Sequence, residues 1–223
     1  MPTLLFLALI SLVHAFFSKN PYLPPVIFGR PPGGPLMSAR YLYSNTPLIH
    51  DTSVADQYFT QKSDHFDDAS KETFQQRFWH NAAFANGSTD LVFVVLGGME
   101  TLAASWTTDK GLQHVQWAIE FGAHIVCVEH RFAGKSVPVQ KGINTAVLSK
   151  LLTVKQAFRD VVELILGHKW GFNSSRWMLF GASYGGYLAA RINEEYYGLF
   201  IGTVASSAPV HNVEDFPAMV SNI

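Results

Sequence analysis

Ser183 lies in a glycine-rich segment whose spacing suits a nucleophilic serine. Residues 181–186 read GASYGG, which satisfies Gly-x-Ser-x-Gly, and they lie between an apolar run and a segment with helical spacing. A strand-to-helix turn this sharp strains the serine backbone, and only glycine two residues to either side keeps neighbouring side chains away. The pattern therefore predicts Ser183 as a nucleophile whose hydroxyl stands clear of the turn. The alternative is a packing turn in which the serine only caps the helix.

Two backbone segments are candidates for the oxyanion hole that such a nucleophile requires. One donor is the amide of Tyr184, directly after the serine, where the first helix amides also favour negative charge. The other donor is expected from the loop after an earlier buried strand. Gly98 and Met99 occupy that loop, because residues 97–100 (GGME) follow the apolar run at 91–96. A simple glycine turn is the alternative interpretation.

The sequence offers no convincing base for Ser183. Residues 184–223 contain one histidine, His211, which we interpret as a loop histidine because no later strand carries an acid to orient it. The catalytic acid and base are therefore expected to be absent from these residues. No spacing suggests a metal site, since His124 and His130 lie on opposite sides of a strand end and no His-Glu-x-x-His occurs. We expect no metal and no cofactor.

The elements that would position these residues alternate between strands and helices. Continuous apolar runs predict strands buried on both faces, and apolar residues at helical spacing predict helices between them. The predicted strands are 91–96, 123–128, 177–180 and 200–205, and the predicted helices are 112–121, 153–168 (with Thr153 as N-cap) and 187–197. Before them, 58–66 and 73–80 alternate apolar and polar residues, which predicts an antiparallel strand pair with one solvated face. This order predicts an α/β fold with a mostly parallel sheet.

The composition is that of a globular protein with a large buried interior. Of 223 residues, 48% are hydrophobic and only 15% are charged, compared with roughly 25% in an average soluble domain. The net charge of −1 and the lack of a basic tract argue against nucleic acid as a partner. One cysteine excludes a disulfide framework or a cysteine-rich zinc module within these residues.

The N-terminal residues are expected to lie outside the folded domain. An apolar run precedes Ala15, and its length and flanks predict a signal peptide at 1–15. The run is too short for a membrane span, and a buried N-terminal helix is the alternative. Residues 16–55 are rich in proline, which predicts an extended arm or pro-segment. The globular domain is expected at 56–223.

Two Asn-x-Ser/Thr sequons support entry into the secretory pathway. They begin at Asn86 and Asn173, and both fall where turns are predicted. We therefore expect glycans at both asparagines of a secreted protein.

Five stretches of the chain occur in an order that resembles one family. They are 61–66 (QKSDHF), 73–78 (TFQQRF), 129–136 (EHRFAGKS), the serine turn at 181–186 and 204–210 (VASSAPV). These stretches resemble those of the prolylcarboxypeptidase family of serine peptidases. That family includes lysosomal Pro-Xaa carboxypeptidase, dipeptidyl peptidase II and thymus-specific serine protease. The resemblance runs from about residue 57 to the end, so it concerns the N-terminal part of the family's fold.

The resemblance implies an α/β-hydrolase fold whose C-terminal part is missing from this chain. It implies a serine-type exopeptidase that cleaves peptides next to proline, with Ser183 as nucleophile and Tyr184, Gly98 and Met99 at the oxyanion hole. It further implies a secreted, lysosomal or vacuolar protein whose partners are peptides that contain proline. A homodimer of the full-length form is compatible with it.

Three positions depart from the family pattern. Ala182 replaces the glycine before the serine, Met99 replaces the glutamate of Gly-Gly-Glu, and Ala133 replaces a tyrosine. Substrate contacts from these loops are therefore expected to differ, whereas the backbone amides are unaffected. The family pattern gives a structural or pocket-supporting role to three residues before the serine: His65, Glu129 and His130.

Two other functions stay open at this point. A catalytically incompetent secreted protein, whether a short isoform, a pseudoenzyme or an incomplete gene product, would also explain the absence of the acid and base. An esterase of the same fold is the third candidate, and the peptidase-like stretches argue against it.

Overall fold

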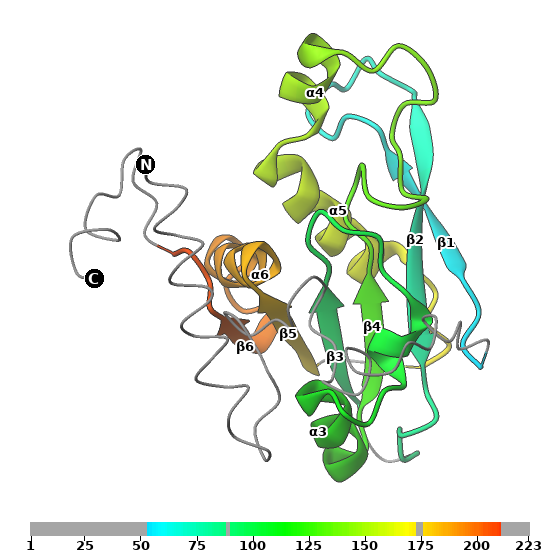
Figure 1. Ribbon diagram of the computed structural model, residues 1–223, viewed down its shortest axis with the longest axis vertical. Helices are drawn as coiled ribbons and strands as arrows, with labels where there is room; N and C mark the ends of the chain where they lie inside the picture. Colours follow the sequence, from blue (N-terminus) through cyan, green and yellow to red (C-terminus); the bar gives the residue numbers. More distant parts are fainter. Residues whose placement is uncertain (1–52, 88–89, 173–175, 211–223) are drawn as a thin grey trace, which may run out of the picture.

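The computed structural model describes residues 53–87, 90–172 and 176–210, and within these ranges the chain forms one mixed sheet with helices on both faces (Figure 1). The strand order is β1-β2-β4-β3-β5-β6. The strands are β1 (Gln57–Lys62), β2 (Thr73–Asn81), β3 (Leu91–Leu96), β4 (His124–Val128), β5 (Arg176–Ala182) and β6 (Phe200–Ser206). The predicted signal peptide and most of the predicted proline-rich arm lie outside the described residues.

The centre of the sheet is parallel and buried, as the apolar runs predict. Every residue of β3 and of β4 is buried. Strand β3 pairs in parallel with β4 on one side and with β5 on the other, and β5 pairs in parallel with β6. Parallel strands of this kind need covering on both faces, which explains why their sequences lack alternation.

The N-terminal strand pair is antiparallel, but its second strand is not at the rim of the sheet. Strand β2 pairs with β1 and also, antiparallel, with β4, so it is an interior strand whose residues are mostly buried. The expectation of one solvated face is therefore wrong for β2, and it holds better for β1, where exposed and covered residues alternate. Strand β1 also ends at Lys62 rather than at residue 66.

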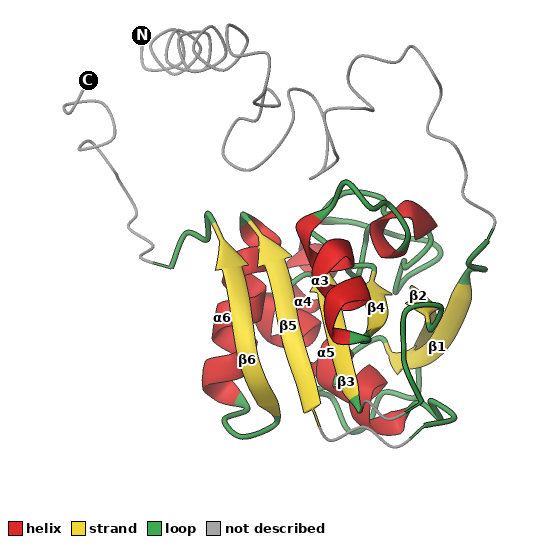
Figure 2. Cartoon of the chain, turned by 90° about the horizontal axis from the view of Figure 1, so that it is seen from below, coloured by secondary structure: helices red, strands yellow, loops and turns green. Residues whose placement is uncertain are grey.

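Two helices cover one face of the sheet and one covers the other. Figure 2 shows α3 (Gln113–Phe121) in front of the sheet, with α5 (Val154–Gly167) and α6 (Tyr184–Glu195) behind it. Each layer has its own apolar core. One core contains buried side chains of α5 and α6 against the sheet, and the other contains those of α3 and the 3-10 helix η1 (Ala104–Thr107).

Local sequence signals explain where the helices begin and end. The Thr153 side chain accepts a hydrogen bond from the Gln156 amide, which confirms it as the N-cap of α5. Helix α3 ends at Phe121 and is capped by Gly122, whose φ of 65° is the left-handed conformation that glycine adopts without strain. The short helix α4 (Thr145–Leu151), capped by Asn144, was not predicted, because most of its residues are exposed and no apolar stripe marks it. No helix in the described ranges is both long and apolar enough to cross a membrane.

Candidate active site

Ser183 lies at a sharp turn between β5 and α6. Its φ of 52° and ψ of −122° fall outside the regions that a residue with a side chain prefers. Helix α6 begins at Tyr184, three residues earlier than predicted, so the serine directly precedes the first helical amides. Such strain costs of order 1–3 kcal/mol and persists only where the surroundings enforce it.

Three glycines make this turn sterically feasible. A Cβ on Gly181 would lie 2.1 Å from the carbonyl oxygen of Gly185, and one on Gly186 would lie 3.0 Å from that of Ser206. A Cβ on Gly185 would lie 2.7 Å from the carbonyl oxygen of Leu96, at the end of β3. The glycines of the Gly-x-Ser-x-Gly pattern are therefore required by backbone contacts inside the turn and with β3.

Backbone hydrogen bonds fix the serine from both sides. The Ser183 amide donates to the carbonyl of Ser206 at 2.9 Å, where β6 ends, and the Tyr187 amide donates to the Ser183 carbonyl at 2.9 Å. The turn is thus held between the last residue of β6 and the first turn of α6. These contacts enforce the strained backbone.

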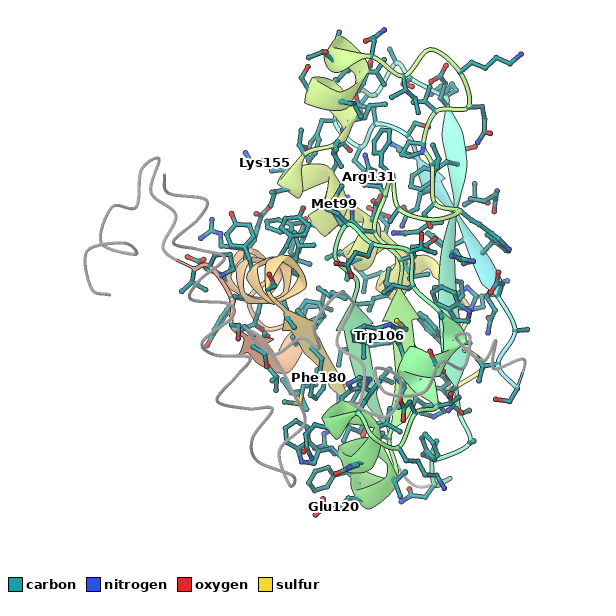
Figure 3. The ribbon with its side chains drawn as sticks, viewed as in Figure 1. Met99, Trp106, Glu120, Arg131, Lys155 and Phe180 are labelled. Carbon is teal, nitrogen blue, oxygen red and sulfur yellow. The ribbon has the colours of Figure 1, made fainter. Side chains whose placement is uncertain are left out.

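The loop after β3 begins next to this turn. The contact of Gly185 with Leu96 places the start of residues 97–100 beside the serine turn, and the Gly97 amide donates to the Val128 carbonyl at 3.0 Å. A Cβ on Gly97 would lie 2.6 Å from Leu102, whereas Gly98 faces open space. Met99 is 47% exposed and is labelled in Figure 3. The segment predicted to supply an oxyanion donor therefore lies at the carboxyl end of β3 with an accessible backbone.

An aromatic-walled cavity of about 200 Å³ opens beside the two loops. Gly98 and Ala182 contribute its loop side, and its walls include Trp106, Trp117 and Phe180. Trp106 and Phe180 are labelled in Figure 3, on η1 and β5 respectively. A concave, largely apolar space next to a strained serine is typical of a substrate site.

The Tyr184 side chain turns back onto the loop after β4. Its hydroxyl lies 3.1 Å from Nε2 of His130, and the two rings meet edge to face with centroids 5.4 Å apart. Burial, together with the neighbouring Tyr187, raises the pKa of Tyr184 to about 12. Burial also lowers the pKa of His130. Both groups are therefore neutral at physiological pH.

Glu129 organises the same loop after β4, of which it is the first residue. Its carboxylate is fully buried and accepts hydrogen bonds from the guanidinium of Arg77, at 2.6 and 3.2 Å, and from the Ser136 hydroxyl at 2.8 Å. Gly134 has φ 47°, and a Cβ there would lie 2.1 Å from a Glu129 oxygen. The Glu-His-Arg stretch therefore begins with a structural carboxylate.

Asp160 on α5 is a second buried centre, and no motif in the sequence marks it. Its carboxylate accepts two hydrogen bonds from Arg131, both at 2.7 Å, and lies 2.7 Å from Nε2 of His65. Arg131 also donates to the carbonyls of Ser63 and Leu151. The available signal was an acidic residue on the apolar stripe of an amphipathic helix. His65 and Glu129 thus form structural contacts.

Of the two predicted glycan acceptors, the structure describes Asn86. Asn86 is exposed, and its backbone amide donates a hydrogen bond to the Gly122 carbonyl. Asn173 and His211 lie outside the described residues. Cys127 is a buried free thiol in the middle of β4. Within the described ranges, no group of three or more acidic, histidine or cysteine side chains could hold a metal ion.

Two solved structures are similar to much of this chain at low sequence identity. A probable hydrolytic enzyme from Pseudomonas aeruginosa matches 70% of this chain and 42% of its own, at 17% identity with a TM-score of 0.47. An esterase from Pyrococcus furiosus matches 75% of this chain and 55% of its own, at 14% identity with a TM-score of 0.45. The mostly parallel sheet, its antiparallel N-terminal pair and the strained serine between β5 and α6 are the features of an α/β-hydrolase fold.

Sequence relatives cover most of the chain. A Caenorhabditis elegans protein named as a serine protease is 37% identical over 201 residues, which are 87% of this chain and 37% of that protein. Human thymus-specific serine protease is 36% identical over 162 residues, or 71% of this chain and 31% of its own. Human lysosomal Pro-X carboxypeptidase is 33% identical over 168 residues, which are 71% of this chain and 32% of that protein. The chain thus spans about a third of the length of these curated relatives.

The family profile described as serine carboxypeptidase S28 matches residues 61–223, a range that begins in β1 and includes the strained serine, the loop after β3 and both buried carboxylates. Because this match spans well over half of the sequence, the chain belongs to the serine carboxypeptidase S28 family.

Proposed function

We propose that this chain supplies the nucleophile and the oxyanion hole of a serine exopeptidase that cleaves peptides next to proline. The observation that carries the proposal is the strained backbone of Ser183, at φ 52° and ψ −122°, in a turn whose Gly185 packs against the end of β3. A strained serine on a glycine-flanked turn between a strand and a helix is the arrangement used by serine nucleophiles of this fold. Family membership supports peptide bonds as the substrate.

The proposed reaction is acyl transfer through Ser183. The Ser183 Oγ attacks the carbonyl carbon while a general base takes its proton, and the tetrahedral intermediate forms with its negative charge on the former carbonyl oxygen. The amides of Tyr184 and of Gly98 or Met99 donate hydrogen bonds to that oxygen. The intermediate then collapses, the proton passes to the leaving amine, and an acyl-enzyme forms. Water attacks the acyl carbon and gives a proton to the base, which returns it to the Ser183 Oγ as the ester bond breaks.

The base and its orienting acid are not assigned to a described residue. His130 is the histidine beside α6, but both of its ring nitrogens already make hydrogen bonds within the fold. We propose that an aspartate and a histidine encoded beyond Ile223 complete the triad, in agreement with the Ser, Asp/Glu, His order of this fold. The 223-residue chain alone is then expected to hydrolyse peptides at background rate.

Specificity for proline is proposed from the relatives. The name of the Pro-X carboxypeptidase states that specificity for that protein. The aromatic cavity beside Ala182 is compatible with an apolar ring, since Trp106 and Phe180 are among its walls. An exopeptidase of the carboxypeptidase type is the form that the family description favours.

Hydrolysis of prolyl peptides by two forms of the protein tests this proposal. One form is the 223-residue chain, and the other is the chain extended by the sequence that follows Ile223 in its gene. The extended form should release products beside proline, and Ser183→Ala should reduce that rate to background without changing the circular dichroism spectrum. An active extended form whose rate is unaffected by Ser183→Ala would exclude Ser183 as the nucleophile. Ser183-dependent turnover by the short chain would disprove the requirement for a later acid and base.

Entry into the secretory pathway is proposed from the sequence of residues 1–15 and from the two sequons. Protein secreted from eukaryotic cells should begin at Phe16 and lose mass on treatment with an N-glycosidase. Asn86→Gln should remove part of that mass difference, because its side chain lies on an exposed turn. An intact Met1 in the cytosol would contradict the proposal.

A further inference from the structure

The hydrogen bonds of His130 determine which of its nitrogens carries the proton. Nδ1 lies 2.6 Å from the carbonyl oxygen of Arg131, and a carbonyl can only accept, so Nδ1 is protonated. In the neutral ring, Nε2 then has a free lone pair. The Tyr184 hydroxyl, 3.1 Å away, is therefore the donor and Nε2 the acceptor. This tautomer gives His130 a fixed role as an acceptor that points at α6.

The loop that carries His130 cannot easily move. The His130 carbonyl accepts a hydrogen bond from the Ala133 amide at 3.0 Å, and the Phe132 amide donates one to the Ser136 carbonyl at 2.7 Å. The next residue, Arg131, is fully buried and is bound by both oxygens of Asp160. His130 itself is only 5% exposed. The imidazole is thus attached to a rigid frame that extends from β4 to α5.

Tyr184 is the residue through which this frame reaches the reacting atoms. Its amide follows Ser183 and is the proposed oxyanion donor, while its hydroxyl is bound to His130. Because the backbone at Ser183 is strained, the amide after it needs restraint from outside the turn. An oxyanion donor loses much of its effect when its direction drifts, since stabilisation depends on preorganised geometry.

We propose that His130 is a positioning residue that holds the oxyanion amide of Tyr184 in place by accepting a hydrogen bond from the Tyr184 hydroxyl. This inference rests on the proposed function of Ser183 and Tyr184. The bond also assigns a role to the histidine of the Glu-His-Arg stretch that differs from that of a general base. Its Nε2 is occupied by a neutral hydroxyl and its Nδ1 by a carbonyl, so neither nitrogen is free to take the Ser183 proton.

Nuclear magnetic resonance on the chain itself tests the hydrogen bond independently of activity. Long-range ¹H–¹⁵N spectra distinguish a protonated from an unprotonated ring nitrogen. His130 should show a protonated Nδ1 and an unprotonated Nε2, and Tyr184→Phe should shift the Nε2 resonance while Nδ1 stays protonated. Tyr197→Phe removes a hydroxyl from a side chain that is 95% exposed and should leave both resonances unchanged. A protonated Nε2, or an Nε2 unaffected by Tyr184→Phe, would overturn the inference.

Kinetics of the extended, active form test the positioning role. His130→Asn retains a donor toward the Arg131 carbonyl but loses the acceptor, whereas the amide oxygen of His130→Gln can reach the position of Nε2. Complete loss of an oxyanion donor costs about 10²–10³ in kcat, and a donor that is only loosened costs less, so we expect His130→Asn to reduce kcat about tenfold. KM should stay nearly constant, because the lost interaction acts in the transition state. His130→Gln should recover most of the rate.

A double variant separates positioning from a general loss of stability. Tyr184→Phe should reduce kcat as much as His130→Asn, and the two changes together should cost no more than either alone, since they remove the same bond. Additive losses, or equal losses in His130→Asn and His130→Gln, would contradict the positioning role. If Ser183→Ala leaves the activity unchanged, the proposed function fails, whereas the resonance experiment still decides whether the hydrogen bond exists.

Discussion

The glycines around Ser183 show how a few missing side chains create the site. At positions 181 and 185 the space for a Cβ is occupied by backbone atoms, which cannot rotate away as a side chain would. The sequence pattern was sufficient to predict these roles, because Gly-x-Ser-x-Gly states a steric requirement. It could not predict that Gly185 also contacts the Leu96 carbonyl, since that contact joins residues far apart in the chain.

Gly185→Ala should destabilise the fold, whereas Gly98→Ala should not. The new Cβ at position 185 would lie 2.7 Å from the Leu96 carbonyl oxygen, while the one at position 98 would meet no atom within 4 Å. Alanine favours helices by about 1 kcal/mol over glycine, and overpacking costs about 1–3 kcal/mol, so the net loss at position 185 should reach about 2 kcal/mol. Urea unfolding of the two variants measures the difference. Equal midpoints for both variants would disprove the close contact.

Two buried carboxylates, Glu129 and Asp160, join β2, α5 and the loops after β1 and β4. Glu129 was expected to be structural from the family resemblance, and its contacts with Arg77 and Ser136 agree with that role. Asp160 was missed because an apolar stripe at helical spacing predicts the helix without revealing the exceptions on it. Its partner Arg131 lies 29 residues earlier, and only the folded structure places the two together.

Asp160→Asn should cost about 3–5 kcal/mol of folding stability, because it leaves the fully buried guanidinium of Arg131 without a counter-charge. Glu163→Gln is a matched control on the same helix. Glu163 pairs with Arg159 at the surface, where such pairs contribute about 0–1 kcal/mol. Guanidinium unfolding of both variants, with the wild type as reference, measures the two losses. Similar small losses for both variants would mean that the attraction within the buried ion pair does not exceed the free-energy cost of its desolvation.

At the scale of the whole molecule, the two ends of the sheet differ in chemistry. The carboxyl ends of the parallel strands carry the serine turn and the loop after β3, which is proposed to supply an oxyanion donor. The opposite end carries a histidine and aromatic cluster, defined as His80, His124, His168, Trp170 and Phe172. The alternation of strands and helices predicted the sheet and its buried centre. The junction of β2 with β4 was not predictable, because β2 reads as an ordinary amphipathic strand that gives no indication of its second neighbour.

This histidine cluster should make the fold sensitive to acid. Burial, together with the nearby His124 and His168, lowers the pKa of His80 from 6.5 to about 4, and burial lowers the pKa of the other two as well. His80 contacts His124 through a 3.1 Å hydrogen bond and packs against Trp170 and Phe172. The unfolded chain therefore binds protons more readily below pH 6.5. The stability contributed by neutral His80 is complete above that pH and is lost as the pH falls toward 4.

Thermal unfolding between pH 7.5 and 4 measures this effect. The melting temperature of the wild type should fall across that interval, and His80→Gln should fall less steeply because it removes one of the titrating groups. Parallel curves for the wild type and the variant would show that His80 does not titrate differently in the folded and unfolded states.

Covalent labelling with a serine-reactive reagent shows whether Ser183 is a nucleophile. A fluorophosphonate reacts when the serine oxygen attacks phosphorus, fluoride leaves and the serine proton is lost to a base. Incubation of the extended protein with this reagent, followed by peptide mass mapping, should place one phosphonyl group on the peptide that contains Ser183. Ser183→Ala should abolish the label, while His130→Asn should slow its formation. A label on another serine, or labelling that persists in Ser183→Ala, would show that Ser183 is not the nucleophile.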